Sequence, residues 1–549
     1  MSQSDNRVYL FDTTLRDGAQ TQGVDFSIAD KVAIAEALDR IGVDYIEAGW
    51  PGANPTDDGF FADPPKFARA RLTAFGMTRR PGRSADNDPG LAAMLGAGTK
   101  AVCMVGKTWD FHVDVALEIS HDENVAMIAE SIAMAKKRGV EEVMFDCEHF
   151  FDGYKANPDY ALRCAKAAYE AGARWVVLCD TNGGTLPDDV ERITGEVVKH
   201  IPGSHIGIHC HNDTENAVAN SLAAVRAGAR QVQGTINGLG ERCGNANLVA
   251  LIPNLMLKMG FDTGIAREEL EHLTHLSRML DDRLHLPSNR SAAYVGERAF
   301  AHKGGLHVSA VEKDPRTYEH IEPGIVGNAR HIVVSDQAGR SNILARFREI
   351  GLDIDANAPE VPKLLDLIKQ RENEGYAYDG ASASFELLAR RMLHSVPDFF
   401  ELNSFRVITE RRFNARGDLI TQSEATVRVA VGEEWVMTVS EGNGPVNALD
   451  GALRKALVPH YPSLGPVSLV DYKVRILNPR GGTAAITRVM IESLDDAGHR
   501  WSCIGVSGNV IDASFNALYD SITYKLFRDK VAPKRQQAGA AAPLRARPL

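Results

Sequence analysis

The chain has 549 residues, 44% of them hydrophobic, and a formal net charge of −11 at pH 7. Its length exceeds what one hydrophobic core usually serves, so two or three domains are expected. The acidic balance argues against nucleic acid and an anionic membrane as main partners, because both favour a basic face. The polar start contains no signal-peptide core, and no later stretch approaches about 18 uninterrupted apolar residues, so we expect a cytoplasmic protein without a membrane span.

Short apolar runs rich in strand-forming residues recur eight times in the first half of the chain. Each run leads through Gly, Asn, Asp or Pro into a segment with helical spacing. The predicted strands cover residues 8–14, 43–49, 72–77, 100–106, 141–147, 174–180, 205–211 and 231–238. Such alternation predicts an α/β fold, a (β/α)8 TIM barrel, as a catalytic domain over residues 1–280. A doubly wound open sheet is the alternative.

Polar side chains follow the ends of the predicted strands, where barrels of this kind carry their chemistry. His209 and His211 stand at alternate positions of one strand, so both point to the same face. With Asp17 after the first strand and Asn245 after the eighth, they offer two nitrogens and two oxygens to one divalent metal ion, which could be Zn, Mn, Co or Mg. If the two histidines are considered alone, the alternative to metal binding is that both are buried in the core with their ring nitrogens hydrogen-bonded to other protein groups.

Arg16 stands directly before the proposed ligand Asp17. Its guanidinium could polarise a substrate oxygen or hold a substrate carboxylate through two hydrogen bonds. An ion pair on the barrel rim is the alternative for this residue.

Four segments together resemble the alpha-isopropylmalate synthase and homocitrate synthase family. They are FDTTLRDGAQ (11–20), HCHND (209–213), GLGERCGNA (238–246) and GGLHVSA (304–310). The resemblance implies metal-dependent condensation of acetyl-CoA, the cosubstrate, with a 2-keto acid. Within the family, FDCEHFFDGYKANPDYAL and the DTNGGTLP loop look most like the citramalate synthases, which use pyruvate. Typical isopropylmalate synthases carry Glu where this chain has Ala19.

The resemblance also implies roles for further residues. Arg16 and Thr181 would grip pyruvate, and Gln20 would order the loop after the first strand. Glu148, His307 and Tyr318 match the family's catalytic positions, with the base left open among the three, and Glu148 is also a candidate for fixing the water that hydrolyses the thioester. Each of the three has a structural alternative. Glu148 could be a carboxylate that only forms ordinary hydrogen bonds or ion pairs, His307 could cap a helix or pack against its neighbours, and Tyr318 could be a buried tyrosine with a hydrogen-bonded hydroxyl.

The pattern after the barrel changes twice. Residues 281–400 are mostly helical with charged faces and predict linker subdomains that complete the active site. Residues 401–530 contain two successive βββα patterns, an internal duplication in which Trp435 and Trp501 each stand seven residues before a Gly-Asn pair. Residues 531–549, rich in Ala, Arg and Pro, predict a disordered tail.

The duplicated segment resembles the family's regulatory domain, so an α+β domain for allosteric control and dimerisation is expected. A homodimer, an isoleucine effector and a place in isoleucine biosynthesis are what the resemblance to the citramalate synthases implies. A small structural or dimerisation domain without an effector is the alternative.

Other functions stay open. The acceptor could be 2-ketoisovalerate or 2-oxoglutarate, as in 2-isopropylmalate and homocitrate synthases. Related barrels with a similar metal site cleave 3-hydroxy-3-methylglutaryl-CoA or 4-hydroxy-2-ketoacids, so a lyase is a second class. The third class is a noncatalytic amino-acid sensor. In such a protein, Asp17→Ala would leave the binding of the amino acid largely unchanged.

Overall fold

A computed structural model describes residues 6–332, 340–352, 354–355, 358–393, 395–413, 415–478, 482 and 484–534. The chain divides into two compact units, which are described separately. The first unit is Met1–Phe300 with His320–His331, and the second is Ala301–Glu319 with Ile332–Leu549. Among the described residues, no helix is both long and apolar enough to cross a membrane.

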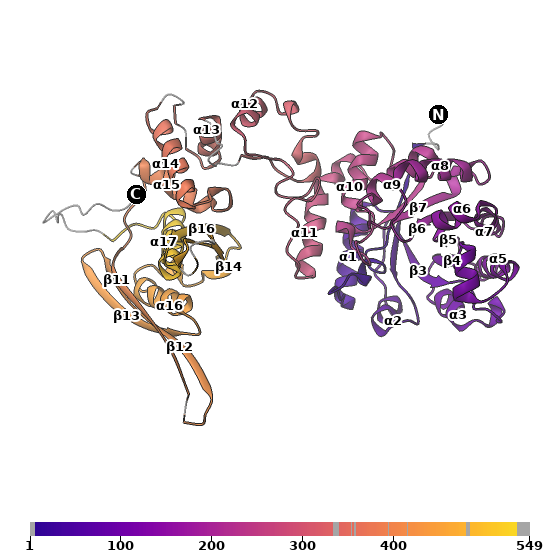
Figure 1. Ribbon diagram of the computed structural model, residues 1–549, viewed down its shortest axis with the longest axis horizontal. Helices are drawn as coiled ribbons and strands as arrows, with labels where there is room; N and C mark the ends of the chain where they lie inside the picture. The colour runs from indigo at the N-terminus through magenta and orange to yellow at the C-terminus, as the bar shows by residue number, and fades with distance from the viewer. Residues whose placement is uncertain are drawn as a thin grey trace. The chain divides into compact units, whose positions relative to one another are not determined.

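The first unit is built on a closed barrel of eight parallel strands in sequence order (Figure 1). The strands are β1 (Tyr9–Asp12), β2 (Tyr45–Gly49), β3 (Arg71–Met77), β4 (Ala101–Lys107), β5 (Glu142–Glu148), β6 (Trp175–Asp180), β7 (Ile206–Cys210) and β8 (Gln231–Gly234). The predicted TIM barrel is therefore confirmed, and each strand lies where its apolar run predicted it.

Helices surround this barrel and alternate with its strands. They are α1 (Ile28–Ile41), α2 (Pro55–Ala62), α3 (Pro89–Gly96), α4 (Asp110–His112), α5 (His121–Lys137), α6 (Phe150–Ala156), α7 (Pro158–Glu170), α8 (Pro187–Val198), α9 (Ala217–Ala227), α10 (Leu248–Pro253) and α11 (Leu273–Arg283). Local sequence sets their ends, as α1 shows. Ser27 and Asp30 form a capping box at its start, and Gly42, with φ of 101°, ends it in the left-handed conformation.

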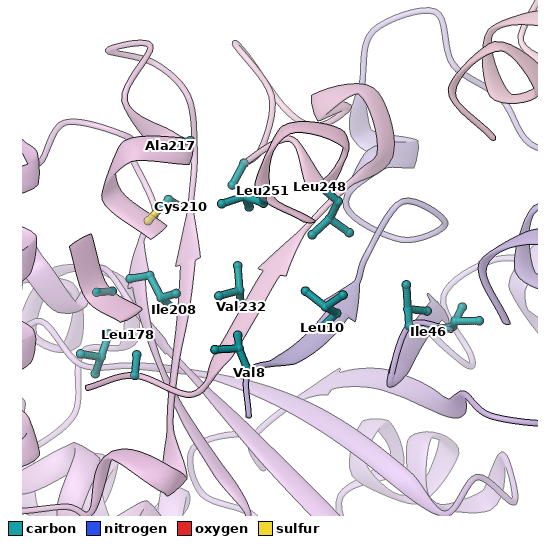
Figure 2. Packing of buried hydrophobic residues seen from close by; sticks show 14 of the residues in the cluster. Val8, Leu10, Ile46, Leu178, Ile208, Cys210, Ala217, Val232, Leu248 and Leu251 are labelled. Carbon is teal, nitrogen blue, oxygen red and sulfur yellow. The ribbon is translucent and has the colours of Figure 1, made fainter. Parts of the chain in front are cut away.

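Alternate strand residues serve two different cores. Ile208, Val232 and Leu10 point outward from β7, β8 and β1, on the side where Figure 2 shows Leu248 and Leu251 of α10. The residues between them point into the barrel, where an inner cluster is formed by Phe11, Tyr45, Phe75, Ala101, Cys103, Met144, Trp175, Val177 and Cys179. Because side chains alternate along a strand, the barrel interior below the strand ends is filled and the polar residues collect at its mouth.

Among its described residues, the second unit contains six α-helices and two antiparallel three-stranded sheets, each sheet followed by one of these helices. The first four helices are α12 (Gly305–Lys313), α13 (Arg340–Glu349), α14 (Glu360–Glu374) and α15 (Ser382–Met392). The duplicated part comprises β11 (Glu401–Phe413), β12 (Leu419–Val431), β13 (Glu434–Gly442) and α16 (Pro445–Leu457), then β14 (Ser468–Ile476), β15 (Thr487–Leu494), β16 (Arg500–Ser507) and α17 (Val510–Arg528). The predicted βββα duplication is confirmed. From residue 535 on, the predicted disordered tail lies outside the described residues.

Candidate active site

Three predicted metal ligands meet at the mouth of the barrel. Asp17 follows β1, His209 lies in β7 and His211 follows it, and one ligand atom from each lies within 4.8 Å of the others. The Nε2 atoms of His209 and His211 lie 3.5 and 3.9 Å from Asp17 Oδ2. All three side chains are buried. The structure therefore gathers residues that are nearly 200 positions apart in the sequence, as the barrel topology predicts.

Asn245, the fourth predicted ligand, is held beside this trio by the loop after β8. It pairs with His211 in an antiparallel β-bridge, and its Nδ2 donates to Leu239 O at 3.1 Å. The loop requires glycine at position 240, because a Cβ there would lie 2.1 Å from Asn245 Nδ2. This close approach explains why a glycine-rich segment carries the ligand.

The unpaired atoms of this cluster fit a bound divalent ion. Asp17 Oδ1 and Asn245 Oδ1 are buried and have no hydrogen-bond partner among the described residues. A buried polar atom left without a partner costs about 1–3 kcal/mol, and coordination would relieve that cost. Two oxygens and two imidazoles form a borderline donor set that suits Zn, Mn, Co or Mg.

Electrostatics keeps the cluster in the protonation states that metal ligands need. Burial and the neighbouring His209 lower the pKa of His211 to about 4, so its imidazole is neutral at pH 7. Burial alone would raise the pKa of Asp17, but Arg16 and the two histidines hold it below its ordinary value. A neutral imidazole, as at His211, and an ionised carboxylate, as at Asp17, are the forms that bind a cation.

Two residues outside the sequence prediction orient His209. Gln233 on β8 accepts a hydrogen bond at Oε1 from His209 Nδ1 at 2.9 Å, and its Nε2 donates to Asp146 Oδ1 at 3.0 Å. Because the amide nitrogen faces Asp146, the amide oxygen must face His209, which places the imidazole proton on Nδ1. The lone pair of Nε2, which lies 3.5 Å from Asp17 Oδ2, is then available to the predicted metal ion. A histidine ligand fixed in this way is a common arrangement around metals.

We expect Gln233→Leu to weaken metal binding by about 10- to 100-fold, because His209 would lose the acceptor that fixes its tautomer. Mn²⁺ binding to the purified protein, followed by electron paramagnetic resonance, measures this directly. Gln231→Leu is the matched control, because Gln231 points into the same barrel one pleat below and makes only a weak contact with the Met144 sulfur. Equal Mn²⁺ affinities for the two variants would contradict the assigned role.

Arg16 is fixed beside the trio by carboxylates and an aromatic ring. Its Nε donates to Glu47 Oε2 at 2.6 Å, its Nη1 lies 3.3 Å from Asp17 Oδ2, and its guanidinium lies 3.9 Å above the centre of the Phe75 ring. Burial alone would lower the pKa of Arg16, but Glu47 and Asp17 raise it above its ordinary value. The structure therefore holds a permanent positive charge beside the predicted ligand Asp17.

Gln20 and Arg16 line one cavity of about 390 Å³ at the barrel mouth. Trp50, after β2, lines the same cavity, and its ring packs edge-on against Phe75. Gln20 is exposed to solvent, and Arg16 is mostly buried. Of the three predicted substrate-binding residues, Arg16 and Gln20 therefore share one concave surface, and Thr181 does not line it.

Glu148 and Thr181 lie at the ends of neighbouring strands β5 and β6. The Glu148 carboxylate forms an ion pair with Lys107, which stands opposite it at the end of β4. Thr181 Oγ1 accepts a hydrogen bond of 2.8 Å from the backbone N of His149. Lys107 was missed by the sequence prediction, because only the strand register shows that it faces Glu148.

His307 and Tyr318 lie in the second unit and contact each other. Their ring centroids are 4.2 Å apart, and both side chains are exposed. His302, in contrast, is largely buried, and its Nε2 lies 3.2 Å from Glu319 Oε1. The structure thus brings the predicted pair together and leaves it accessible, while the neighbouring histidine has a structural partner.

Comparison with known proteins agrees with this geometry. The chain matches the HMGL-like family model over residues 7–277, a homocitrate synthase post-HMGL domain-like model over 294–375, and the LeuA allosteric (dimerisation) domain over 379–526. It is 53% identical to the (R)-citramalate synthase of Aquifex aeolicus, covering 95% of this chain and 98% of that protein. The enzyme of the same name from Geobacter sulfurreducens is 51% identical over 95% and 98% of the two chains, and that from Synechocystis 48% identical over 96% and 97%. The chain therefore belongs to the (R)-citramalate synthases of the alpha-isopropylmalate and homocitrate synthase family, and it is an enzyme of the acyltransferase type.

Proposed function

We propose that the enzyme condenses acetyl-CoA with pyruvate and water to give (R)-citramalate and free CoA. The observation that carries this proposal is the identity of about one half, over nearly the whole length, with proteins named for that activity. Relatives named as 2-isopropylmalate synthases are more distant, at 35% identity for that of Methanopyrus kandleri. The difference favours pyruvate over the larger acceptor 2-ketoisovalerate.

Pyruvate would be held at the barrel mouth by charge and hydrogen bonds. Asp17, His209, His211 and Asn245 would bind a divalent ion, which supplies Lewis acidity toward the keto acid when bound. Arg16 presents the rest of its guanidinium to the substrate carboxylate, and Thr181 presents its hydroxyl from the next rim position. Gln20 lines a cavity together with Arg16 and would order the loop after the first strand. These contacts orient the keto carbon toward the incoming methyl group.

A base must remove one methyl proton from acetyl-CoA before the new carbon–carbon bond forms. Glu148, His307 and Tyr318 are the proposed groups for this proton transfer. Lys107 forms an ion pair with the Glu148 carboxylate, and the rings of His307 and Tyr318 pack against each other, which keeps these two candidate groups side by side. Glu148 is also proposed to position the water that releases CoA from the thioester.

Thiol release from acetyl-CoA by the metal-supplied enzyme tests the proposal, with pyruvate, 2-ketobutyrate, 2-ketoisovalerate and 2-oxoglutarate compared as acceptors. We expect kcat/KM for pyruvate to exceed that for 2-ketoisovalerate by about 10-fold or more, the discrimination that one or two methyl groups allow. A preference for 2-ketoisovalerate would move the enzyme to isopropylmalate synthesis. No release with any acceptor, together with cleavage of an acyl-CoA, would establish a lyase instead.

The remaining features of the proposal follow from the family. The enzyme is proposed to be cytoplasmic, to act in isoleucine biosynthesis as a homodimer, and to be inhibited by isoleucine bound to the C-terminal domain. The match to the LeuA allosteric (dimerisation) domain supports the proposed homodimer and the proposed control by an effector. The proposed domain organisation is a barrel over 1–280, linker subdomains over 281–400 and a regulatory domain over 401–530.

A further inference from the structure

The turn that follows β5 is held from both sides. Glu148 ends β5, and its backbone O accepts hydrogen bonds from the backbone N and the hydroxyl of Thr108, at 3.3 and 2.8 Å. The next residue, His149, donates its backbone N–H to Thr181 Oγ1 at 2.8 Å. Because Thr108 follows β4 and Thr181 follows β6, the turn is tied to the strand ends on either side of it.

His149 has a backbone conformation that is uncommon for a residue with a side chain. Its φ of 54° and ψ of 38° lie in the left-handed region, where a Cβ crowds the backbone and glycine is favoured. A residue keeps such a conformation only where the surrounding structure holds it there. Here the conformation joins β5 to α6, and the backbone N–H of His149 reaches across to the end of β6.

The imidazole of His149 is fixed by a carboxylate and two rings. Its Nδ1 lies 3.0 Å from Asp152 Oδ2, which also accepts a hydrogen bond of 3.0 Å from Asn182 Nδ2. The imidazole packs edge-on against His112, with ring centroids 4.4 Å apart, and the Trp109 ring lies 5.8 Å away. Burial alone would raise the pKa of Asp152, but His149 and Asn182 hold it below its ordinary value, so this carboxylate is an acceptor at pH 7. These contacts hold His149 in the left-handed conformation.

The hydrogen bond from His149 determines how the Thr181 hydroxyl can act. A hydroxyl has one proton to donate and two lone pairs that accept protons. The backbone N–H of His149 occupies one of these lone pairs. Among the residues that the structure describes, Thr181 Oγ1 forms no other hydrogen bond. Its proton is therefore free for a bound molecule, and a substrate carboxylate or keto oxygen is an acceptor of the right kind.

We propose that His149 is a positioning residue for pyruvate, because its left-handed backbone holds the Thr181 hydroxyl as a hydrogen-bond donor toward the substrate. The inference rests on the proposed binding of pyruvate by Thr181. The backbone N–H of His149 makes the contact with Thr181, and the imidazole acts by fixing the turn against Asp152. The effect of a substitution at position 149 should therefore follow its tolerance of the left-handed conformation.

Two substitutions of His149 separate the backbone from the ring. His149→Gly and His149→Val both remove the imidazole, but glycine adopts the left-handed conformation without a steric cost, whereas a β-branched residue is strongly disfavoured there. In the full-length, metal-supplied enzyme, we expect KM for pyruvate to rise about tenfold for His149→Val and about threefold for His149→Gly, while KM for acetyl-CoA stays unchanged. Equal rises would mean that the imidazole itself acts, and no rise in either variant would mean that His149 has no role; both results would overturn the inference.

Lys530→Val is the matched control for backbone strain. Lys530 also has a φ of 54°, is exposed, and follows α17 in the second unit. Valine at this position should lower the unfolding temperature but leave KM for pyruvate unchanged. Circular dichroism and thermal unfolding of both valine variants check that they are folded under the assay conditions.

A double-mutant cycle tests whether His149 acts through Thr181. Thr181→Val removes the hydroxyl and keeps the shape of the side chain, so we expect KM for pyruvate to rise about tenfold. Adding His149→Val should then raise it by less than about twofold more, because both changes remove one and the same hydrogen bond to the substrate. If the two effects multiplied, His149 would act independently of Thr181 and the inference would fail.

The same measurements separate this inference from the proposed function. If Thr181→Val left KM for pyruvate unchanged while the wild-type enzyme released CoA with pyruvate, Thr181 would not bind pyruvate, and the inference would fail although the condensation stands. A wild-type enzyme that released no CoA with pyruvate would contradict the proposed function itself, and the inference would fail with it.

Discussion

Asp17→Asn should lower kcat by about a thousandfold, equivalent to about 4 kcal/mol of transition-state stabilisation. Asp17 lies between both histidines of the cluster, and its Oδ1 is one of the two buried oxygens without a partner among the described residues. The amide keeps the shape of the side chain but removes the negative charge that attracts a divalent ion. We therefore expect Mn²⁺ affinity to fall together with kcat, and both are measurable on the same preparation.

The fold should survive this change, because Arg16 keeps its ion pair with Glu47. Asp63→Asn is the matched control: Asp63 is exposed, follows α2, and does not line the cavity that Arg16 and Gln20 share. It should retain wild-type metal affinity and activity. If Asp17→Asn bound Mn²⁺ as tightly as the wild type, the cluster would not be the metal site, and the sensor or another non-metal function would have to be reconsidered.

The barrel and the clustering of the predicted metal ligands were predictable because each depends on a short-range sequence pattern. Strand period places His209 and His211 on one face and Ile208 on the other, and the structure shows Ile208 in the outer core as expected. Parallel strands all end at one rim, so Asp17 and Asn245 had to approach the histidines once the barrel was recognised. The topology of the barrel alone therefore predicts that these residues lie close together.

The supporting residues could not be predicted in the same way. Gln233 and Asp146 are 87 positions apart, and only the closed barrel brings their side chains together. A signal existed, since a glutamine at an inward-facing strand position needs a polar partner, but the sequence does not say which one.

The two tryptophans illustrate the same limit. Trp435 and Trp501 occupy equivalent places in the duplicated sequence, yet Trp435 is 52% exposed and Trp501 is 3% exposed. Trp501 faces α17, whereas on β13 it is Thr438, three residues from Trp435, that faces the helix. A shift of one residue in strand pairing reverses which side chains are buried, and similar sequence spacing does not reveal it.

Arg16→Lys should lower kcat/KM for pyruvate by about 100- to 1000-fold, the usual effect of removing a donor aimed at developing charge. Arg16 contacts Glu47 and Asp17 with different parts of one planar fork, and the rest of the fork is proposed to hold the substrate carboxylate. A lysine ammonium is a point charge and cannot make all three contacts at once. Replacement by an uncharged residue would be less informative, because leaving Glu47 buried without its partner costs about 3–5 kcal/mol of stability.

Arg7→Lys is the matched control for this change. Arg7 also pairs with a carboxylate, that of Asp44, and its guanidinium lies 4.6 Å from the centre of the Tyr9 ring, but it precedes β1 at the opposite end of the barrel. The same substitution there should leave kcat/KM within about threefold of the wild type, as expected for a partly exposed ion pair. Steady-state kinetics over a range of pyruvate concentrations and thermal unfolding of both variants separate the two effects. If Arg16→Lys lowered only the unfolding temperature and left kcat/KM unchanged, Arg16 would be a structural ion pair of the rim, and the carboxylate of pyruvate would have to be held by another group at the barrel mouth.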